Sequence, residues 1–299
     1  MPNYKKPVFI IGMPRSGTTL MQGILCNSKK YFPMPETHFF ARATYSLPEK
    51  NLSKKNRKRI RRKLVKKTII KKDLKFADDL NTQKDIFEYL VDQFNPDDAS
   101  TFLEKTPRHV FFYSKIREYY PDAKFICLIR EPKNVISSQL SNSRKQNKSV
   151  IRLSFLYNKI AAVILKIKEH NDVLLIKYES VTGQTEQTIR YTCKFLDISY
   201  DTKLVENVAA PSGIVLPHEF WKYKNIYQET IQRNNADKWR KTLSDNQANT
   251  INFITNSNAR KFGYTSSYKR LKVLNGFQQD MKKLLCKSEL KKIVSIIHG

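Results

Sequence analysis

One short segment of the sequence combines an arginine, three hydroxyl side chains and two glycines: residues 12–19, GMPRSGTT. The spacing of the glycines matches the phosphate-binding loop G-x-x-x-x-G-K-S/T, except that Thr18 stands in place of the lysine. The backbone N–H groups of such a loop, with the hydroxyls of Ser16, Thr18 and Thr19, can bind a phosphate. In phosphate loops this lysine neutralises the β- and γ-phosphates of ATP or GTP. Because it is absent here, the segment favours a nucleotide with one 5′-phosphate group over ATP or GTP. A chance glycine-rich turn is the alternative interpretation.

A second candidate phosphate site follows the apolar run that ends at Ile129. Arg130 comes directly after this run, and Ser138 lies eight residues later in a segment with helical spacing. A guanidinium can donate two parallel hydrogen bonds to phosphate oxygens, and Ser138 would lie about two helical turns further along. A surface cation after an edge strand is the alternative for Arg130, but it does not account for the pair.

Both segments resemble those of the sulfotransferase superfamily, whose members transfer a sulfuryl group from 3′-phosphoadenosine 5′-phosphosulfate (PAPS). Residues 14–20, PRSGTTL, resemble the loop that binds the 5′-phosphosulfate, and residues 127–132, CLIREP, with Ser138 resemble the element that binds the 3′-phosphate. The resemblance extends over most of residues 7–265. It implies PAPS as co-substrate and adenosine 3′,5′-bisphosphate (PAP) as product. The nucleotide-binding residues that it implies are Arg15, Ser16, Gly17, Thr18, Thr19, Arg130 and Ser138.

The detailed pattern is most similar to that of tyrosylprotein sulfotransferases and related bacterial enzymes. Residues 35–38, PETH, place Glu36 21 residues after Arg15, as in those enzymes, where this Glu is the general base. A carboxylate can take the proton of the acceptor hydroxyl as it attacks sulfur, and partial burial would raise the Glu36 pKa toward the working pH. His38 is the competing base, because other sulfotransferases use histidine. A cap or turn residue is the alternative for Glu36, and an ordinary loop side chain for His38.

Residues 104–107, EKTP, resemble the family's Lys-Thr-Pro element, in which the lysine points toward the sulfuryl group. Negative charge builds on the bridging oxygen as the S–O bond breaks, so Lys105 and Arg15 would stabilise the transition state. An ion pair with Glu104 or Asp98 is the alternative for Lys105. The scheme requires no metal, and we see no DxD or H-x-x-H pattern in the sequence.

Two further residues are expected near the nucleotide. Tyr178, which follows the apolar run 173–176, would stack on or hydrogen-bond the nucleotide, or else pack as a core aromatic residue. Arg233 would complete the PAPS pocket before residues 234–240, NNADKWR, where relatives commonly carry a tryptophan. Asn142 stands where the tyrosylprotein enzymes have a second phosphate-binding arginine, and Arg144 would replace it only if its helix ended early.

The elements that must position these residues alternate along the chain. Short β-rich apolar runs predict strands at residues 8–12, 101–103, 123–129 and 173–176. Helical spacing predicts helices at residues 18–26, 54–72, 83–94, 107–120, 133–142, 150–170, 185–196, 244–261 and 278–298. Strands separated by helices predict an α/β fold, a three-layer sandwich with a central, mainly parallel sheet of about five strands. The phosphate loop would join the first strand to the first helix.

Length and composition bound the class of protein. The chain has 299 residues, 40% of them hydrophobic, and can bury a substantial core without disulfides or metals. We expect a sulfotransferase domain at residues 1–268 and a basic helical extension at residues 269–299. The four cysteines are too widely spaced for a zinc site or a disulfide framework. No apolar run approaches the roughly 18 residues of a membrane span and no secretory signal is evident, which predicts a cytoplasmic protein.

The charge is strongly basic: 55 Lys and Arg against 27 Asp and Glu give a net charge of +28, which favours anionic partners. Twelve basic residues and no acidic one lie within residues 54–72. A nucleic-acid-binding protein is therefore one alternative, disfavoured because Ile60, Leu64 and Ile69 give this segment an apolar stripe and leave its lysines in solvent. A P-loop kinase is the other, disfavoured by the missing lysine. We expect a sulfotransferase that acts on a hydroxyl of a phenol, tyrosine, sugar or lipid. The sequence leaves open whether this acceptor is acidic and whether the protein forms a homodimer.

Overall fold

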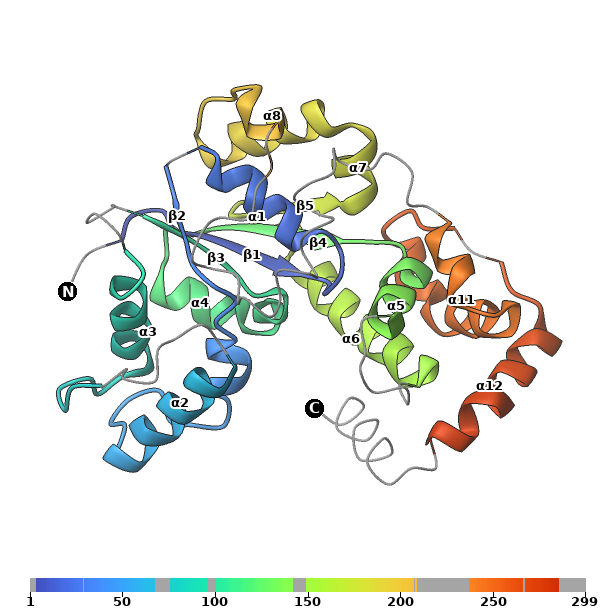
Figure 1. Ribbon diagram of the computed structural model, residues 1–299, viewed down its shortest axis with the longest axis horizontal. Coiled ribbons are helices and arrows are strands. Elements are labelled where there is room, and N and C mark those ends of the chain that lie inside the picture. The colour runs from blue at the N-terminus through green and yellow to red at the C-terminus, as the bar shows by residue number, and fades with distance from the viewer. Residues whose placement is uncertain are drawn as a thin grey trace.

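A parallel sheet of five strands lies at the centre of the molecule (Figure 1). The structure is a computed structural model, which describes residues 4–28, 30–67, 76–95, 101–141, 149–206, 208, 237–265 and 267–284. The strands are β1 (Val8–Gly12), β2 (Phe32–Pro33), β3 (Phe102–Lys105), β4 (Lys124–Ile129) and β5 (Val173–Lys177). Their order is β2-β3-β1-β4-β5, so β1 is central and pairs with β3 and β4. The predicted α/β fold with a parallel sheet is confirmed.

Helices cover both faces of the sheet, because alternate side chains of each strand point to opposite sides. On one face, Val8 and Ile10 belong to a buried cluster with α1 (Thr18–Cys26), α7 (Tyr178–Gly183), α8 (Thr185–Leu196) and α9 (Lys203–Glu206). On the other face, Phe9 and Phe125 belong to a larger, aromatic cluster with α3 (Gln83–Asp92), α4 (Tyr113–Tyr119) and α6 (Val150–Ile167). These layers form the expected sandwich (Figure 1).

The basic segment forms α2 (Lys54–Lys67), which packs beside η1, a short π-helix at Phe39–Ala43. Ile60 and Leu64 are buried in the aromatic cluster, as the predicted apolar stripe requires. Lys63 Nζ donates to the backbone oxygen of Arg42 at 2.7 Å, which ties α2 to η1. The predicted helix 54–72 is confirmed as far as residue 67, and residues 68–75 lie outside the described residues.

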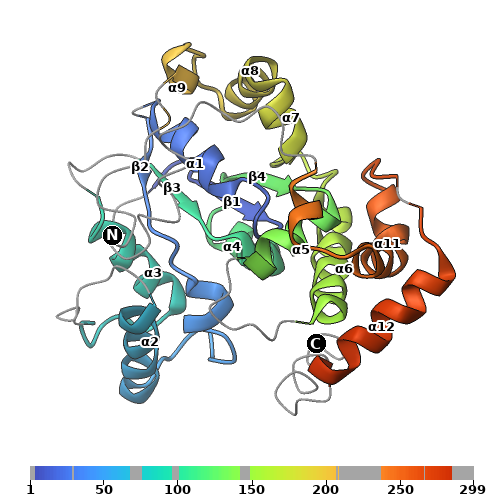
Figure 2. The ribbon, with the colours of Figure 1, turned by 45° about the vertical axis from the view of Figure 1, so that its right-hand side comes forward.

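Three helices, one from the middle of the chain and two from its C-terminal part, pack beside the sandwich (Figure 2). They are α5 (Pro132–Ser141), α11 (Asp245–Arg260) and α12 (Arg270–Leu284). A Cβ at Gly276 would lie 2.1 Å from Thr250 Oγ1, so glycine permits close contact between α12 and α11. Asp280 on α12 accepts hydrogen bonds from Ser149 Oγ (2.6 Å) and the Ile151 N–H (3.0 Å) at the start of α6. The predicted domain division at residues 268 and 269 stays a prediction.

Three sequence-based expectations about elements need correction. The helix expected from residue 278 begins eight residues earlier, at Arg270, and residues 285–299 lie outside the described residues. Residues 107–120 form two helices, a 3-10 helix η2 (Pro107–Phe112) and α4, because the backbone at Phe112 is not helical (φ −118°, ψ 17°). Neither β2 nor η1 was expected. Among the described residues, no helix is long and apolar enough to cross a membrane.

Candidate active site

The loop between β1 and α1 lies at the carboxyl edge of the sheet and depends on two glycines. Gly12 has a φ of 116°, and a Cβ there would lie 2.3 Å from the Leu128 backbone oxygen on β4. Gly17 has a φ of 83°, and a Cβ there would lie 2.6 Å from the Tyr178 ring. The residue at the N-cap of α1, Gly17, offers no capping side chain. The N–H groups at the start of this helix can therefore donate to an anion.

The two predicted phosphate elements meet beside this loop. Arg15 Nε donates to Ser138 Oγ at 3.0 Å, and Arg130 Nη1 donates to the backbone oxygen of Arg15 at 3.2 Å. The Arg130 guanidinium lies over the Tyr178 ring, 4.0 Å from its centroid. Arg130 Nε is buried and has no hydrogen-bond partner among the described residues. Residues from the ends of β1, β4 and β5 thus surround one place at the carboxyl edge of the sheet.

Two further residues, Glu179 and Tyr264, connect the segments around this place, a role that the sequence did not indicate. Glu179 Oε1 accepts a hydrogen bond from the Glu131 N–H at 3.1 Å, and Glu179 Oε2 accepts one from the Tyr264 hydroxyl at 2.8 Å. Glu179 thereby joins the segment after β4 to the segment after α11. The only sequence signal was the position of Glu179 next to Tyr178, because Tyr264 is 85 residues away along the chain.

Glu36, Lys105 and His38 form a second group at the same edge. Lys105 Nζ donates to Glu36 Oε2 at 2.9 Å, and His38 Nε2 lies 3.3 Å from Glu36 Oε1. The Lys105 side chain is 5% exposed and the Glu36 side chain 34%. Lys105 comes from the end of β3, and Glu36 from the segment that follows β2. The alternative ion pair of Lys105 with Glu104 is not formed, since Glu104 contacts other residues, and Asp98 lies outside the described residues.

The charge state of this group differs from the sequence-based expectation. Burial alone would raise the pKa of Glu36, but the Lys105 ammonium, His38 and the hydrogen bond from Lys105 outweigh it and hold the pKa at about 2. The expectation of a raised Glu36 pKa is therefore wrong for this arrangement. Burial lowers the pKa of His38 to about 4, although Glu36 opposes this effect. At neutral pH, Glu36 is a carboxylate and His38 is uncharged.

His38 has an unusual backbone and an unusual ring environment. Its φ of 50° and ψ of 26° lie in the left-handed region, which a residue other than glycine adopts at a cost of the order of 1 kcal/mol. Its Nδ1 is buried and has no hydrogen-bond partner among the described residues. If Nε2–H points at Glu36, Nδ1 carries a lone pair. His38 therefore stays the competitor to Glu36 that the sequence indicated.

Arg108 lies near Glu36, and two further arginines, Arg42 and Arg152, lie near Arg108. Burial lowers the pKa of Arg108, and the positive charges of Arg42 and Arg152 lower it further. These arginines lie on η1, η2 and α6, of which η2 contacts the other two. Phe40 on η1 packs edge-on against His109 on η2 (5.1 Å), and Lys159 on α6 lies over Phe111 on η2 (5.8 Å). No described carboxylate pairs with the side chain of Arg42 or Arg108.

The remaining expectations concern residues that are not placed. Arg233, Asn142 and Arg144 lie outside the described residues. Within the described ranges, no group of three His, Cys, Asp or Glu side chains is arranged to hold a metal ion.

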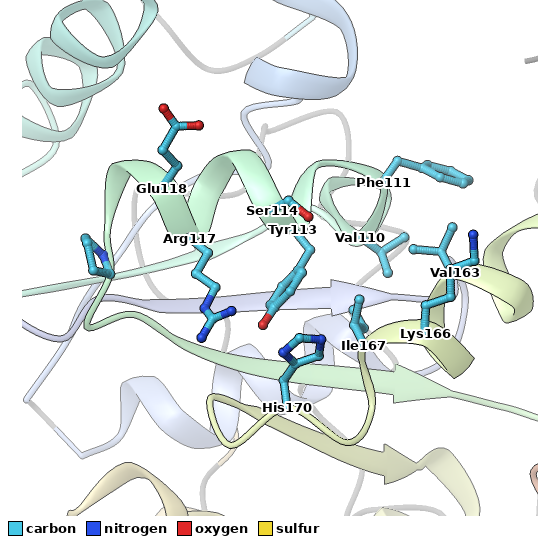
Figure 3. A pocket seen from close by; sticks show the side chains of 11 residues that line it. Val110, Phe111, Tyr113, Ser114, Arg117, Glu118, Val163, Lys166, Ile167 and His170 are labelled. Carbon is cyan, nitrogen blue, oxygen red and sulfur yellow. The ribbon is translucent and has the colours of Figure 1, made fainter.

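A groove of about 640 Å³ lies away from this site, at the amino ends of β4 and β5 (Figure 3). Tyr113, Arg117 and His170 line it, and no residue of the predicted site does. Two of its polar side chains are engaged with Asp172: the Tyr113 hydroxyl donates to it at 2.7 Å, and Arg117 pairs with it at 3.1 Å. The carboxyl edge of the sheet therefore remains the candidate active site.

Known proteins similar to this chain share its fold. The sulfotransferase domain from the Synechococcus PCC 7002 olefin synthase is 20% identical, with a TM-score of 0.62 over 89% of this chain and 98% of that chain. The sulfotransferase domain from the curacin biosynthetic pathway is 18% identical, with a TM-score of 0.60 over 88% of this chain and 99% of that chain. An uncharacterized protein of Aquifex aeolicus (strain VF5) is 23% identical over 248 residues, 79% of this chain and 31% of that protein. The chain thus spans about a third of the length of this curated relative.

A family model gives the stronger assignment. The model of the sulfotransferase family matches residues 7–202, about two thirds of the chain. The matched range includes the phosphate loop, Glu36, Lys105, Arg130 and Ser138. The chain belongs to the sulfotransferase family.

Proposed function

We propose that this protein transfers the sulfuryl group of PAPS to a hydroxyl group of an acceptor. The observation that carries the proposal is the contact between the two phosphate elements, in which Arg15 binds Ser138 and Arg130 binds the backbone of Arg15. A nucleotide with phosphates at both the 5′ and the 3′ positions would need two anion sites side by side. ATP would instead need a cation at the position that Thr18 occupies.

The residues present fit this co-substrate. Gly17 lets the loop pass close to the Tyr178 ring, where a Cβ would lie 2.6 Å from the ring, and the N–H groups of Thr18 and Thr19 begin α1. Arg15, Ser16, Gly17, Thr18 and Thr19 would hold the 5′-phosphosulfate. The buried Nε of Arg130, which has no described partner, would serve the 3′-phosphate together with Ser138. Tyr178 would hold the Arg130 guanidinium in place through the contact at 4.0 Å. PAPS supplies an activated sulfuryl group whose leaving group is the 5′-phosphate of PAP.

Lys105 would control how basic Glu36 is. While Lys105 donates to Glu36, the carboxylate is a weak base, because its pKa is held at about 2. If the ammonium turned toward another anion, burial of Glu36 would raise its pKa instead. Glu36 could then take the proton of an acceptor hydroxyl, while Lys105 and Arg15 would stabilise negative charge that develops on the oxygen of the leaving group.

The acceptor that we propose carries an anionic group near its hydroxyl. Arg108 lies near Glu36, and burial and the positive charges of Arg42 and Arg152 destabilise the Arg108 cation. A phosphate, sulfate or carboxylate on the acceptor would relieve this repulsion and would accept hydrogen bonds from the guanidinium groups. Whether the hydroxyl belongs to a phenol, a tyrosine, a sugar or a lipid is a question for a screen of acceptors.

The test compares three nucleotides and then screens acceptors. Calorimetry should show PAP binding at least tenfold more tightly than adenosine 5′-phosphate or ATP. The protein with sulfur-labelled PAPS should then label hydroxyl-bearing molecules, and anionic ones faster than matched neutral ones. A preference for ATP would favour a P-loop kinase, and equal, weak binding of all three nucleotides would contradict the proposed site.

A further inference from the structure

A fully buried carboxylate lies directly next to Lys105 in the sequence. Glu104 on β3 is 0% exposed, and its register partner on β1 is Phe9, a member of the aromatic cluster. A carboxylate that is removed from water must be compensated by hydrogen-bond donors or positive charge. Its contacts should therefore show what it does for the fold or for the site.

Three side chains compensate Glu104. Its Oε1 accepts hydrogen bonds from Thr37 Oγ1 at 2.8 Å and Thr106 Oγ1 at 2.6 Å. His109 Nδ1 lies 3.1 Å from Oε2 and donates, because an ionised carboxylate only accepts. Burial alone would raise the pKa of Glu104, but His109 and the two threonines outweigh it and hold the pKa below its usual range.

The two threonines carry this anchor to the loop that holds Glu36. Thr37 Oγ1 accepts a hydrogen bond from the Phe39 N–H at 3.2 Å, and Thr106 Oγ1 accepts one from the His38 N–H at 3.3 Å. These bonds fix the loop on both sides of the strained residue His38. The chain of contacts runs from the buried carboxylate through each hydroxyl to a loop amide.

We infer that Glu104 is a positioning residue, which holds residues 36–39 against β3 and so places the Glu36 carboxylate beside the Lys105 ammonium. Successive residues of a strand point to opposite faces, so Glu104 and Lys105 cannot both turn toward the same layer. Glu104 anchors the loop from inside the protein, while Lys105 meets Glu36, which is partly exposed. The inference rests on the proposed roles of Glu36 and Lys105.

The test removes single hydroxyls without changing side-chain shape. Thr37→Val and Thr106→Val each break one link, whereas Thr37→Ser keeps its hydroxyl and serves as the conservative variant. Thr255→Val is the matched control, because Thr255 is equally buried and donates to the Ile251 backbone oxygen at 2.8 Å on α11. Glu104→Gln tests the anchor itself, and the valine variants keep the test decisive if Glu104→Gln does not fold.

Two measurements report the position of the loop without any acceptor. Amide hydrogen exchange at residues 38 and 39 should become at least tenfold faster in Thr37→Val, Thr106→Val and Glu104→Gln, and stay within about twofold of wild type in Thr37→Ser and Thr255→Val. Acylation of Lys105 by an amine reagent, followed by mass spectrometry, should accelerate in the same variants, since Lys105 is 5% exposed and paired. A merely structural role would lower the melting temperature of all the valine variants, Thr255→Val included, and leave Lys105 acylation unchanged.

The outcomes separate this inference from the proposed function. Wild-type rates of exchange and acylation in both Thr37→Val and Thr106→Val would overturn the role of Glu104. PAP affinity should change less than twofold in these variants, because among the described residues the hydrogen bonds of Glu104 go to Thr37, Thr106 and His109 and not to the phosphate elements. Failure of the wild-type protein to bind PAP would contradict the proposed function and leave the exchange result intact.

Discussion

Replacement of Lys105 by methionine should expose the coupling between Lys105 and Glu36. The variant keeps the length and apolar part of the side chain and removes the ammonium that lies 2.9 Å from Glu36. The pKa of Glu36 falls from 4.5 to about 2 in the folded protein, although burial opposes the fall. Without Lys105, only His38 and His109 oppose the effect of burial, so the pKa of Glu36 should rise well above 2.

The size of the effect follows from this fall of about 2.5, which corresponds to at most about 3.4 kcal/mol. The Glu36 side chain is 34% exposed, so solvent screening reduces the contribution to roughly 1–2 kcal/mol. A group with a depressed pKa stabilises the folded state above its unfolded pKa and loses this contribution as the pH falls through its folded pKa. The stabilisation by Glu36 should therefore be complete above about pH 5 and disappear toward about pH 2.

The assay is chemical denaturation of wild type and Lys105→Met at about pH 7, 5 and 3. The free energy of unfolding should differ by about 1–2 kcal/mol at pH 7 and by clearly less at pH 3. Lys84→Met is the matched control, because Lys84 pairs with Glu88 at 3.7 Å and is 43% exposed, so its loss should cost less than about 0.5 kcal/mol. A difference for Lys105→Met that stays constant between pH 7 and pH 3 would refute the coupling.

Three further predictions follow from the candidate site. Arg130→Ala should weaken PAP binding by roughly 2–4 kcal/mol and leave adenosine 5′-phosphate binding nearly unchanged, which calorimetry checks; equal losses for the two ligands would refute the 3′-phosphate assignment. Glu36→Gln should lower turnover about 100-fold or more at nearly constant PAPS affinity, and His38→Ala should lower it less; the reverse order in steady-state kinetics would make His38 the base. Joint replacement of exposed α2 cations by Gln should raise the acceptor KM and flatten its salt dependence without changing PAP affinity, whereas an unchanged KM would make α2 a solvated surface only. The residues to replace are Lys58, Arg59 and Arg62; Arg57 is unsuitable because it binds Asp78 and the Leu52 backbone oxygen, each at 2.8 Å.

The central fold could be predicted because its elements are marked by local patterns. The strands that end at Gly12 and Ile129 are continuous apolar runs that are buried on both faces, which is typical of a parallel sheet. The strand β2 was missed because two residues are too few to show a pattern of apolar and polar side chains. The start of α12 was missed because Leu271 and Leu274 are exposed although apolar and a glycine stands at position 276, so no clear apolar stripe is visible; the contact with α11 explains the glycine.

The sequence indicated which residues lie at the candidate site but not how they interact, and their roles stay predictions. The loop spacing indicated Arg15, and the resemblance to the sulfotransferase superfamily added Lys105 and the role of Arg130; the structure brings each of them to the carboxyl edge of the sheet. The predicted direction of the Glu36 pKa shift was wrong because the shift depends on Lys105, which is 69 residues away in the sequence. The anchoring role of Glu104 was missed for the same reason, because Glu104 and Thr37 are 67 residues apart in the sequence. Such long-range pairs leave no local pattern.

The arrangement of the strands explains how one lysine can serve two partners. β3 and β1 are neighbours in the sheet, so Lys105 at the end of β3 lies near the phosphate loop at the end of β1 as well as near Glu36. An ammonium paired with Glu36 keeps this carboxylate a weak base, which in the proposed enzyme would disfavour proton transfer before the co-substrate binds. An anion at the loop would compete for the same ammonium, and Glu36 would become basic only then. In the proposed enzyme, one side chain would thus link binding of the donor to activation of the acceptor.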